Sequence, residues 1–196
     1  MTNQDPTPMI QTLAILSDTH GSNHYIKLTI DKLQKAHVQT LIHLGDNYSD
    51  ADAFINTGFE VTRVPGTWGK EYQNPSIDNR CFYPFHDWTL FLSHTPETHY
   101  NDLENDLDPT LILREKLCDM FCHGHTHKPS ISTHHDTIIL NPGHLKEHDN
   151  RGYPPTYALL STSKEGDDQQ LRILIKELLT DNTYDEQIVS KTTHNQ

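Results

Sequence analysis

The stretch that decides the fold spans residues 13–46 and reads LAILSDTHGSNHYIKLTIDKLQKAHVQTLIHLGD. It begins with a short apolar run that stops at Ser17-Asp18-Thr19-His20-Gly21, and it ends with a second apolar run that stops at Gly45-Asp46. Between the two runs, apolar residues recur at helical spacing over residues 23–36. A strand, a helix and a strand within about 30 residues predict a βαβ unit with two parallel strands.

Polar residues follow both predicted strands. Because the crossover returns the chain to its starting side, Asp18, His20 and Asp46 are expected together at the carboxyl edge of the sheet. Two carboxylates and a histidine in one place, with no adjacent lysine or arginine in the sequence, repel one another unless a cation lies between them. The spacing therefore predicts a metal site.

Two more apolar runs end in histidine. Residues 90–92 precede Ser93-His94-Thr95, and residues 120–122 precede His123-Gly124-His125-Thr126-His127. Neutral imidazole is the commonest protein ligand for transition metals. A lone histidine after a strand is more often a surface or core residue, but four strand ends of this kind in one short chain indicate a shared site.

These motifs, together with Asn141-Pro142-Gly143, resemble in order those of the calcineurin-like metallophosphoesterases, in particular the small bacterial and archaeal phosphodiesterase branch. The resemblance covers residues 13–143. It implies an α/β fold of four layers, in which two facing mixed β-sheets are flanked by helices and a two-metal site lies on the loops at their edge.

The resemblance also implies roles for individual residues. Asp18, His20 and His127 would bind one metal, His94 and His125 the other, and Asp46 would bridge them, with a bridging hydroxide as the nucleophile. Carboxylates and imidazoles without a thiolate favour manganese, our first choice, or nickel, iron or zinc. Two such ions, two carboxylates and a hydroxide leave a local charge of about +1, which attracts a phosphodiester despite the formal net charge of −12.

The chain departs from the family pattern at Val64-Pro65-Gly66-Thr67-Trp68-Gly69-Lys70-Glu71. Thr67 stands where the family has an asparagine ligand, and Trp68 stands where a histidine can protonate the leaving group. We expect either a weaker second metal site or a replacement oxygen from Glu71. His144, just after Asn-Pro-Gly, is the internal candidate for the missing acid, and substrates with good leaving groups should be favoured.

Function is therefore predicted to be hydrolysis of small phosphodiesters. A degraded second site leaves open an alternative, a non-catalytic metal-binding interaction module on the same fold, as in the retromer subunit. Polymeric nucleic acid is an unfavoured partner, because 15 scattered lysines and arginines face 27 acidic residues.

Composition sets the remaining expectations. The 196 residues are expected to form one domain, with loose tails at residues 1–9 and about 180–196. Three cysteines, no signal-peptide pattern and no long apolar segment predict a cytoplasmic protein without a membrane partner. Residues 156–161 and 170–175 are expected to form a hairpin that completes the second sheet, and a helix is expected from Pro109, capped by Asp108, to about Leu117. A homo-oligomer built on an exposed sheet edge is left open.

Overall fold

Two β-sheets form the centre of the computed structural model, which describes residues 12–165 and 168–192. Within these residues the strands are β1 (Thr12–Leu16), β2 (Thr40–His43), β3 (Glu60–Arg63), β4 (Arg80–Phe85), β5 (Trp88–Ser93), β6 (Met120–Cys122), β7 (Ser130–His134), β8 (Thr137–Asn141), β9 (Thr156–Glu165), β10 (Asp168–Glu177) and β11 (Thr183–Thr192). The helices are α1 (Asn23–Lys35), α2 (Asp52–Ile55) and α3 (Pro109–Arg114), with short 3-10 turns η1 (Tyr48–Ala51) and η2 (Lys70–Gln73).

The first sheet has the strand order β11-β10-β9-β1-β2-β3. β1 and β2 are parallel, and Leu16 lies opposite His43 at their ends. The helix α1 between them buries Ile26, Ile30 and Leu33. The predicted βαβ unit is therefore confirmed, and the residues that follow β1 and β2 leave the sheet on the same side.

The second sheet has the order β4-β5-β6-β8-β7. Its three central strands, β5, β6 and β8, are parallel to one another, whereas β4 and β7 pair antiparallel at the two edges. Both sheets are thus mixed, and in each of them the parallel strands end on one side, where the loops that follow them lie.

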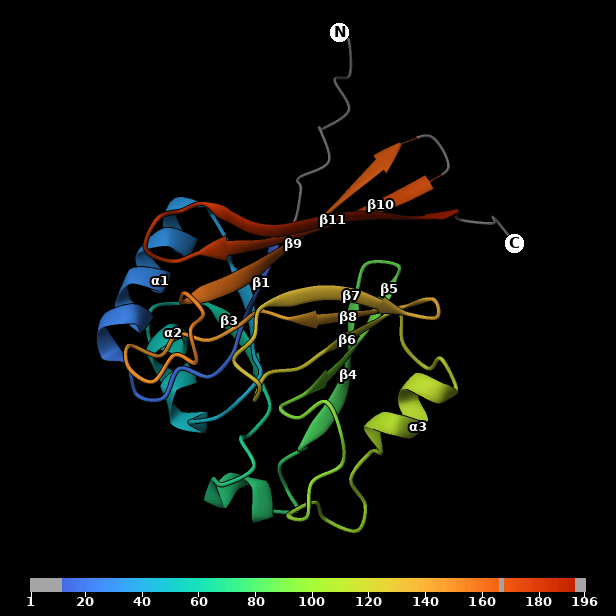
Figure 1. Cartoon of the computed structure of the whole chain (residues 1–196), viewed down its shortest axis with the longest axis horizontal. Helices are drawn as coiled ribbons and strands as arrows, with labels where there is room; N and C mark the ends of the chain where they lie inside the picture. Colours follow the sequence, from blue (N-terminus) through green and yellow to red (C-terminus); the bar gives the residue numbers. More distant parts are fainter. Residues whose placement is uncertain (1–11, 166–167, 193–196) are drawn as a thin grey trace, which may run out of the picture.

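Three apolar cores separate four layers. The largest core lies between the sheets, a second lies between the first sheet and α1 with α2, and a third joins α3 to the outer face of the second sheet. Strand alternation produces this division, because Leu13 and Ile15 face the central core while Ala14 and Leu16 face α1. Figure 1 shows α1 and α2 on one side of the sheets and α3 on the opposite side.

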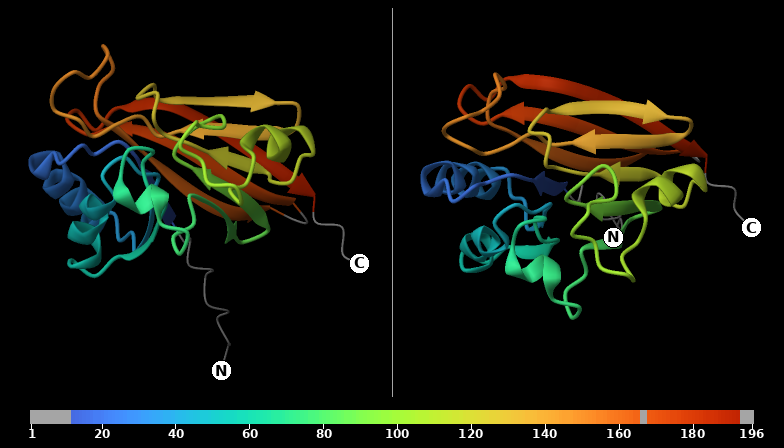
Figure 2. Two further views of the ribbon diagram at one scale, coloured as in Figure 1. Left: turned by 90° about the horizontal axis from the view of Figure 1, so that it is seen from below. Right: turned by 60° about the horizontal axis from the view of Figure 1, so that its bottom comes forward.

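The C-terminal segment corrects two expectations. Residues 183–192 form β11 along β10 instead of a loose tail, and the hairpin of β9 and β10 joins β1 in the first sheet, not the second. β11 is mostly polar because it is an edge strand: Val189 packs against the central core, whereas Ile188 is exposed. Figure 2 shows β10 and β11 (red) beside β7 and β8 (yellow). The expected tail at residues 1–9 lies outside the described residues.

The helices are short. The N-terminus of α3 is as predicted, since the Asp108 side chain accepts hydrogen bonds from the backbone of Thr110 and Leu111 and Pro109 is the first helical residue. The helix ends at Arg114, three residues before the expected end. No helix within residues 12–165 and 168–192 combines the length and the hydropathy that a membrane crossing requires.

A buried ion pair fixes the loops at the end of the second sheet. The Arg80 side chain is 1 % exposed, and its Nη2 lies 2.9 Å from each carboxylate oxygen of Asp102. The same guanidinium donates to Ser93 Oγ and to the Leu107 carbonyl. These charge-assisted hydrogen bonds from one nitrogen to both carboxylate oxygens hold the 99–107 segment against β4.

We expect Asp102→Ala to lower the free energy of unfolding by roughly 3–5 kcal/mol, because it leaves a guanidinium buried without its counter-ion. Glu115→Ala removes an exposed partner of Arg114 and should cost less than about 1 kcal/mol. Urea unfolding of both variants measures the difference. Equal losses would mean that the Arg80–Asp102 pair does not anchor this loop.

Candidate metal centre

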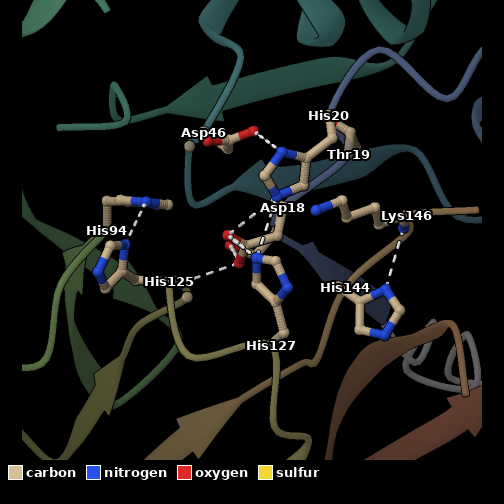
Figure 3. Close-up of polar contacts among 12 residues, drawn as sticks. Asp18, Thr19, His20, Asp46, His94, His125, His127, His144 and Lys146 are labelled. Atoms are coloured by element: carbon tan, nitrogen blue, oxygen red, sulfur yellow. Dashed lines mark hydrogen bonds and ion pairs between the residues drawn. The ribbon is translucent and has the colours of Figure 1, made fainter. Parts of the chain in front are cut away.

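The loops after β1, β2, β5 and β6 meet at one edge of the two sheets and carry the predicted ligands (Figure 3). Backbone hydrogen bonds tie these loops together. Asp18 N donates to the Gly45 carbonyl, and Gly124 N donates to the His94 carbonyl. The structure thus brings together the six motif residues that the sequence singled out, namely Asp18, His20, Asp46, His94, His125 and His127.

Five of these six residues have a left-handed backbone. Positive φ angles occur at Asp18, His20, Asp46, His125 and His127, with values of 53°, 47°, 81°, 65° and 61°. Non-glycine residues adopt this region rarely, and each instance costs of order 1–3 kcal/mol. Seven other non-glycine residues of the described chain share this conformation, but only in this group do several of them point their side chains to one place.

Asp18 is the most enclosed member. It is 1 % exposed, and its Oδ2 accepts hydrogen bonds from Ser17 Oγ at 2.6 Å and from the His125 backbone N–H at 2.9 Å. Burial alone would raise the pKa of this carboxyl, but hydrogen bonds from His127 and Ser17 and the charge of His94 outweigh it and hold the pKa below its usual range. Asp18 is therefore a carboxylate, as a metal ligand must be.

Asp18, His20 and His127 form one group whose ligand atoms lie within 4.8 Å of one another. The Nε2 atoms of the two histidines are 3.0 Å apart, and His127 Nε2 is 3.3 Å from Asp18 Oδ1. His127 Nδ1 is buried and finds no hydrogen-bond partner among the described residues. Three electron-rich atoms that converge in this way fit a divalent cation.

Asp18, Asp46 and His94 form the second group. His94 Nδ1 donates to the Leu44 carbonyl at 2.8 Å, which leaves its Nε2 as an acceptor directed at the site. His125 Nδ1 lies 3.3 Å from that Nε2, and burial together with the neighbouring His94 lowers the pKa of His125. His94 thus directs an acceptor nitrogen at the site, and His125 is suited to bind metal in the neutral form.

Asp46 shares its position between the two groups. Its Oδ2 lies 2.6 Å from Nδ1 of His20, a residue of the first group, and so orients that ring. Asp46 itself belongs to the second group. Gly66 packs directly against Asp46, since a Cβ on this glycine would come within 2.4 Å of the Asp46 backbone. This contact explains why the Asp46 loop needs glycine at residue 66.

Thr67 and Glu71, which lie where the chain departs from the family pattern, differ in their surroundings. Thr67 is 2 % exposed, and its Oγ1 is buried without a hydrogen-bond partner among the described residues. Glu71 belongs to neither group, and its carboxylate lies against Gly69 and 4.0 Å from Lys70 Nζ. Thr67, unlike Glu71, therefore has a buried oxygen that makes no hydrogen bond with the described residues.

His144 does not have the geometry of a leaving-group acid. Its side chain is buried, its Nδ1 accepts a hydrogen bond from the Lys146 backbone, and its Nε2 donates to the Tyr153 carbonyl. Burial lowers the pKa of His144, and no ring proton is free to leave toward a substrate. The expectation drawn from the sequence is corrected: His144 positions the loop that follows Asn141-Pro142-Gly143.

Lys146 is the residue of this loop that sequence reasoning missed. It lines a shallow cavity together with His20, and Figure 3 shows its side chain extending toward His20 and Asp18. Its Nζ donates to Asp149, an exposed carboxylate. The sequence signalled the segment through Asn-Pro-Gly, but only the fold shows that the lysine, two residues beyond His144, faces the centre.

Behind the centre, His43 supports the Asp18 loop. It is fully buried, and its Nδ1 accepts from Gly45 N, so its Nε2 donates to Thr19 Oγ1, which in turn donates to Asp50. Burial lowers the pKa of His43 to about 4, although the charge of Asp50 opposes the shift. His43 is thus a core histidine whose two ring nitrogens are both hydrogen-bonded.

Sequence comparison identifies relatives of the chain. A model of the calcineurin-like phosphoesterase superfamily domain matches residues 12–165. Phosphodiesterase MJ0936 of Methanocaldococcus jannaschii is 26 % identical over 169 residues, which cover 78 % of this chain and 94 % of that protein.

Solved structures share the fold. A predicted phosphoesterase from Streptococcus pneumoniae TIGR4 has a TM-score of 0.64 at 17 % identity, covering 94 % of this chain and 100 % of its own. A single mutant of Vps29 from Entamoeba histolytica has a TM-score of 0.63 at 17 % identity, and the match covers 92 % of this chain and 99 % of that one. Wild-type Vps29 of that organism has been crystallised in complex with Zn²⁺. These likenesses confirm the predicted fold class.

We expect Gly124→Ala to abolish stoichiometric uptake of Mn²⁺ or Zn²⁺. A Cβ at this position would lie 1.9 Å from Ser17 Oγ and 2.6 Å from Asp18 Oδ2, and so would displace the central carboxylate. Gly58→Ala is the control, because Gly58 has a positive φ but open space around it. Titration calorimetry of chelator-treated protein measures uptake, and parent-like binding by Gly124→Ala would contradict the arrangement.

The stability of the metal-free protein should fall between pH 6.5 and pH 4. Unfolded His43 takes up a proton below its ordinary pKa of 6.5, whereas folded His43 stays neutral until about pH 4, so protonation favours the unfolded state. The contribution reaches about 3 kcal/mol at the acid end. Urea unfolding across this range should give a shallower pH slope for His43→Gln than for His86→Gln, which alters an exposed histidine. An unchanged slope would rule out this role for His43.

Proposed function

This chain belongs to the calcineurin-like phosphoesterase superfamily and is a hydrolase that acts on phosphoester bonds, and we propose that its substrates are small phosphodiesters. The observation that carries the proposal is the convergence of two carboxylates, Asp18 and Asp46, with four imidazoles at one site. The named phosphodiesterase relative supports the diester class.

We assign Asp18, His20 and His127 to one metal and His94 and His125 to the other, with Asp46 shared between them. When bound, two divalent ions lower the pKa of a water and hold the oxygens of an in-line displacement. The donor set, hard carboxylates with imidazoles, fits manganese first and also nickel, iron or zinc. The described cysteines lie in or against the apolar cores and so offer no competing thiolate.

Other groups of the chain orient the metal ligands, offer a positive charge to the phosphate and supply a further oxygen. The Leu44 carbonyl holds His94 in the tautomer that exposes Nε2, and Asp46 holds the His20 ring in the same way. Lys146 places a positive charge on the Asp18 side of the centre, where a non-bridging phosphate oxygen can reach it. Thr67 offers its unpartnered hydroxyl in place of the family's amide oxygen.

The leaving group receives no proton from the two positions that were candidates for this task. Trp68 has no acidic proton to give, and both ring nitrogens of His144 are engaged by backbone groups. Aryl and other good leaving groups should therefore be expelled, while alkyl monoesters should react slowly. This asymmetry supports a diesterase with a narrow choice of leaving group.

The second candidate is a metal-binding interaction module without catalysis. The observation that favours it is the structural likeness to Vps29 together with Thr67 at a ligand position. On this proposal the centre holds metal but turns over no phosphoester. Polymeric nucleic acid remains an unfavoured partner in both cases, and a homo-oligomer stays a prediction.

Chelator-treated protein supplied with Mn²⁺ should hydrolyse bis(4-nitrophenyl) phosphate and act poorly on 4-nitrophenyl phosphate. Asp46→Ala should lose at least about 100-fold in kcat/KM, because it removes both the shared carboxylate and the partner of His20. Asp31→Ala, an exposed change on α1, is the matched control. Release of 4-nitrophenol measures both substrates.

Folded protein that binds metal but releases no 4-nitrophenol with manganese, nickel, iron or zinc would favour the interaction module. Parent-like turnover by Asp46→Ala would instead remove the shared-ligand role while leaving the phosphodiesterase proposal in place.

A further inference from the structure

Two exposed aromatic side chains lie side by side near the centre. Trp68 is 72 % exposed and Tyr100 is 74 % exposed, the highest values among the large apolar side chains of the described residues. They come from different loops, yet their ring centroids are 5.5 Å apart in an edge-to-face arrangement. Paired rings in water are a recurrent mark of a binding surface, whereas a single exposed ring is not.

His99 connects this pair to the metal centre. Its ring lies 4.3 Å from Tyr100, 5.8 Å from Trp68 and 6.5 Å from the ring of His125, measured between centroids. The backbone N–H of Asn101 donates to His99 Nδ1 and so fixes the ring orientation. The three rings of Trp68, His99 and Tyr100, here called the aromatic platform, therefore adjoin the His94–His125 half of the centre.

The aromatic platform is held in place by hydrogen bonds between its two loops. Asn101 Nδ2 donates to the Thr67 carbonyl at 2.9 Å, and Gln73 Nε2 donates to the Asn101 carbonyl at 2.7 Å. Asp102 accepts from the His99 backbone and from Arg80, the buried cation. A surface fixed in advance binds a ligand without an ordering cost.

The charge around the platform limits what it can bind. Acidic residues follow it directly in the 102–108 segment, where Glu104 and Asp108 are exposed. A long polyanion would be repelled there, whereas a small molecule that presents one flat ring would not. Faces and edges of aromatic rings bind planar aromatic groups by stacking, with little dependence on which ring is offered.

We propose that the aromatic platform binds a planar aromatic group on the ester that is not expelled from the phosphodiester substrate, while the phosphate lies at the metal centre. The inference rests on the proposed function and specifies its substrate class. It also accounts for the departure at residue 68, because the side chain that cannot act as an acid instead contributes an exposed ring to the site.

The test uses three manganese-activated diesters that share a 4-nitrophenyl leaving group and carry a methyl, a phenyl or a thymidine 5′ group on the other ester. The parent should prefer phenyl or thymidine over methyl by about 10-fold or more in kcat/KM. Trp68→Ala and Tyr100→Ala should bring this ratio toward one, and Trp68→Phe should retain most of it. Tyr184→Ala, which alters an exposed tyrosine on β11, should leave the ratio unchanged.

The phenyl and thymidine diesters show which kind of ring the aromatic platform binds. Preference for both groups, or for phenyl alone, supports a general aryl site, and preference for thymidine alone supports a nucleobase site. Hydrolysis of all three diesters without an aromatic preference, or a preference that survives in both alanine variants, would overturn the platform and leave the phosphodiesterase proposal intact.

A second readout does not depend on turnover. Trp68 is the exposed one of the two tryptophans, since Trp88 is 4 % exposed. Thymidine 5′-monophosphate should quench the fluorescence of manganese-loaded protein, with an apparent affinity at least about 5-fold weaker in Tyr100→Ala. Quenching without hydrolysis would overturn the proposed function alone, and hydrolysis without quenching would count against the platform.

Discussion

The buried carboxylate of Asp18 is the interaction on which the rest of the site depends. A charge that is 1 % exposed must be compensated, and this one is compensated by groups from both sheets. Ser17, which donates to the carboxylate, directly follows β1 of the first sheet, whereas the His125 backbone and His127 come from the loop after β6 in the second. The need to pair one charge thus helps to join two layers whose main contact is the apolar core between them.

Where the loops meet around Asp18, there is little space for side chains larger than that of glycine. Gly124 approaches Ser17 and Asp18 so closely that a methyl group would overlap both, and Gly66 approaches the Asp46 backbone in the same way. The positive φ angles at five of the six motif residues belong to the same compact arrangement. The packed cores on either side of the sheets supply the stability that offsets this strain, which is why the site can be strained without loosening the fold.

A different interaction fixes the loops that carry the aromatic platform. Arg80 and Asp102 form a buried pair that fixes the 99–107 segment, and this segment meets the Thr67–Trp68 loop through Asn101. The aromatic platform stands on that support. The Asp18 site and the aromatic platform are therefore supported by two polar networks, one centred on Asp18 and one on Asp102, which meet at the Thr67 loop.

The sequence by itself determined the βαβ unit, the strand ends and the set of motif residues, because hydrophobic periodicity and local spacing are properties of neighbouring residues. It failed for β11, whose polar edge is stabilised by pairing with β10, and for the sheet that the β9–β10 hairpin joins, since both depend on partners distant in sequence. It selected the segment after Asn141-Pro142-Gly143 but chose His144 where the fold presents Lys146. The grouping of Trp68 with His99 and Tyr100 was likewise decided by tertiary structure alone, because contacts between loops about thirty residues apart leave no periodic trace in the chain.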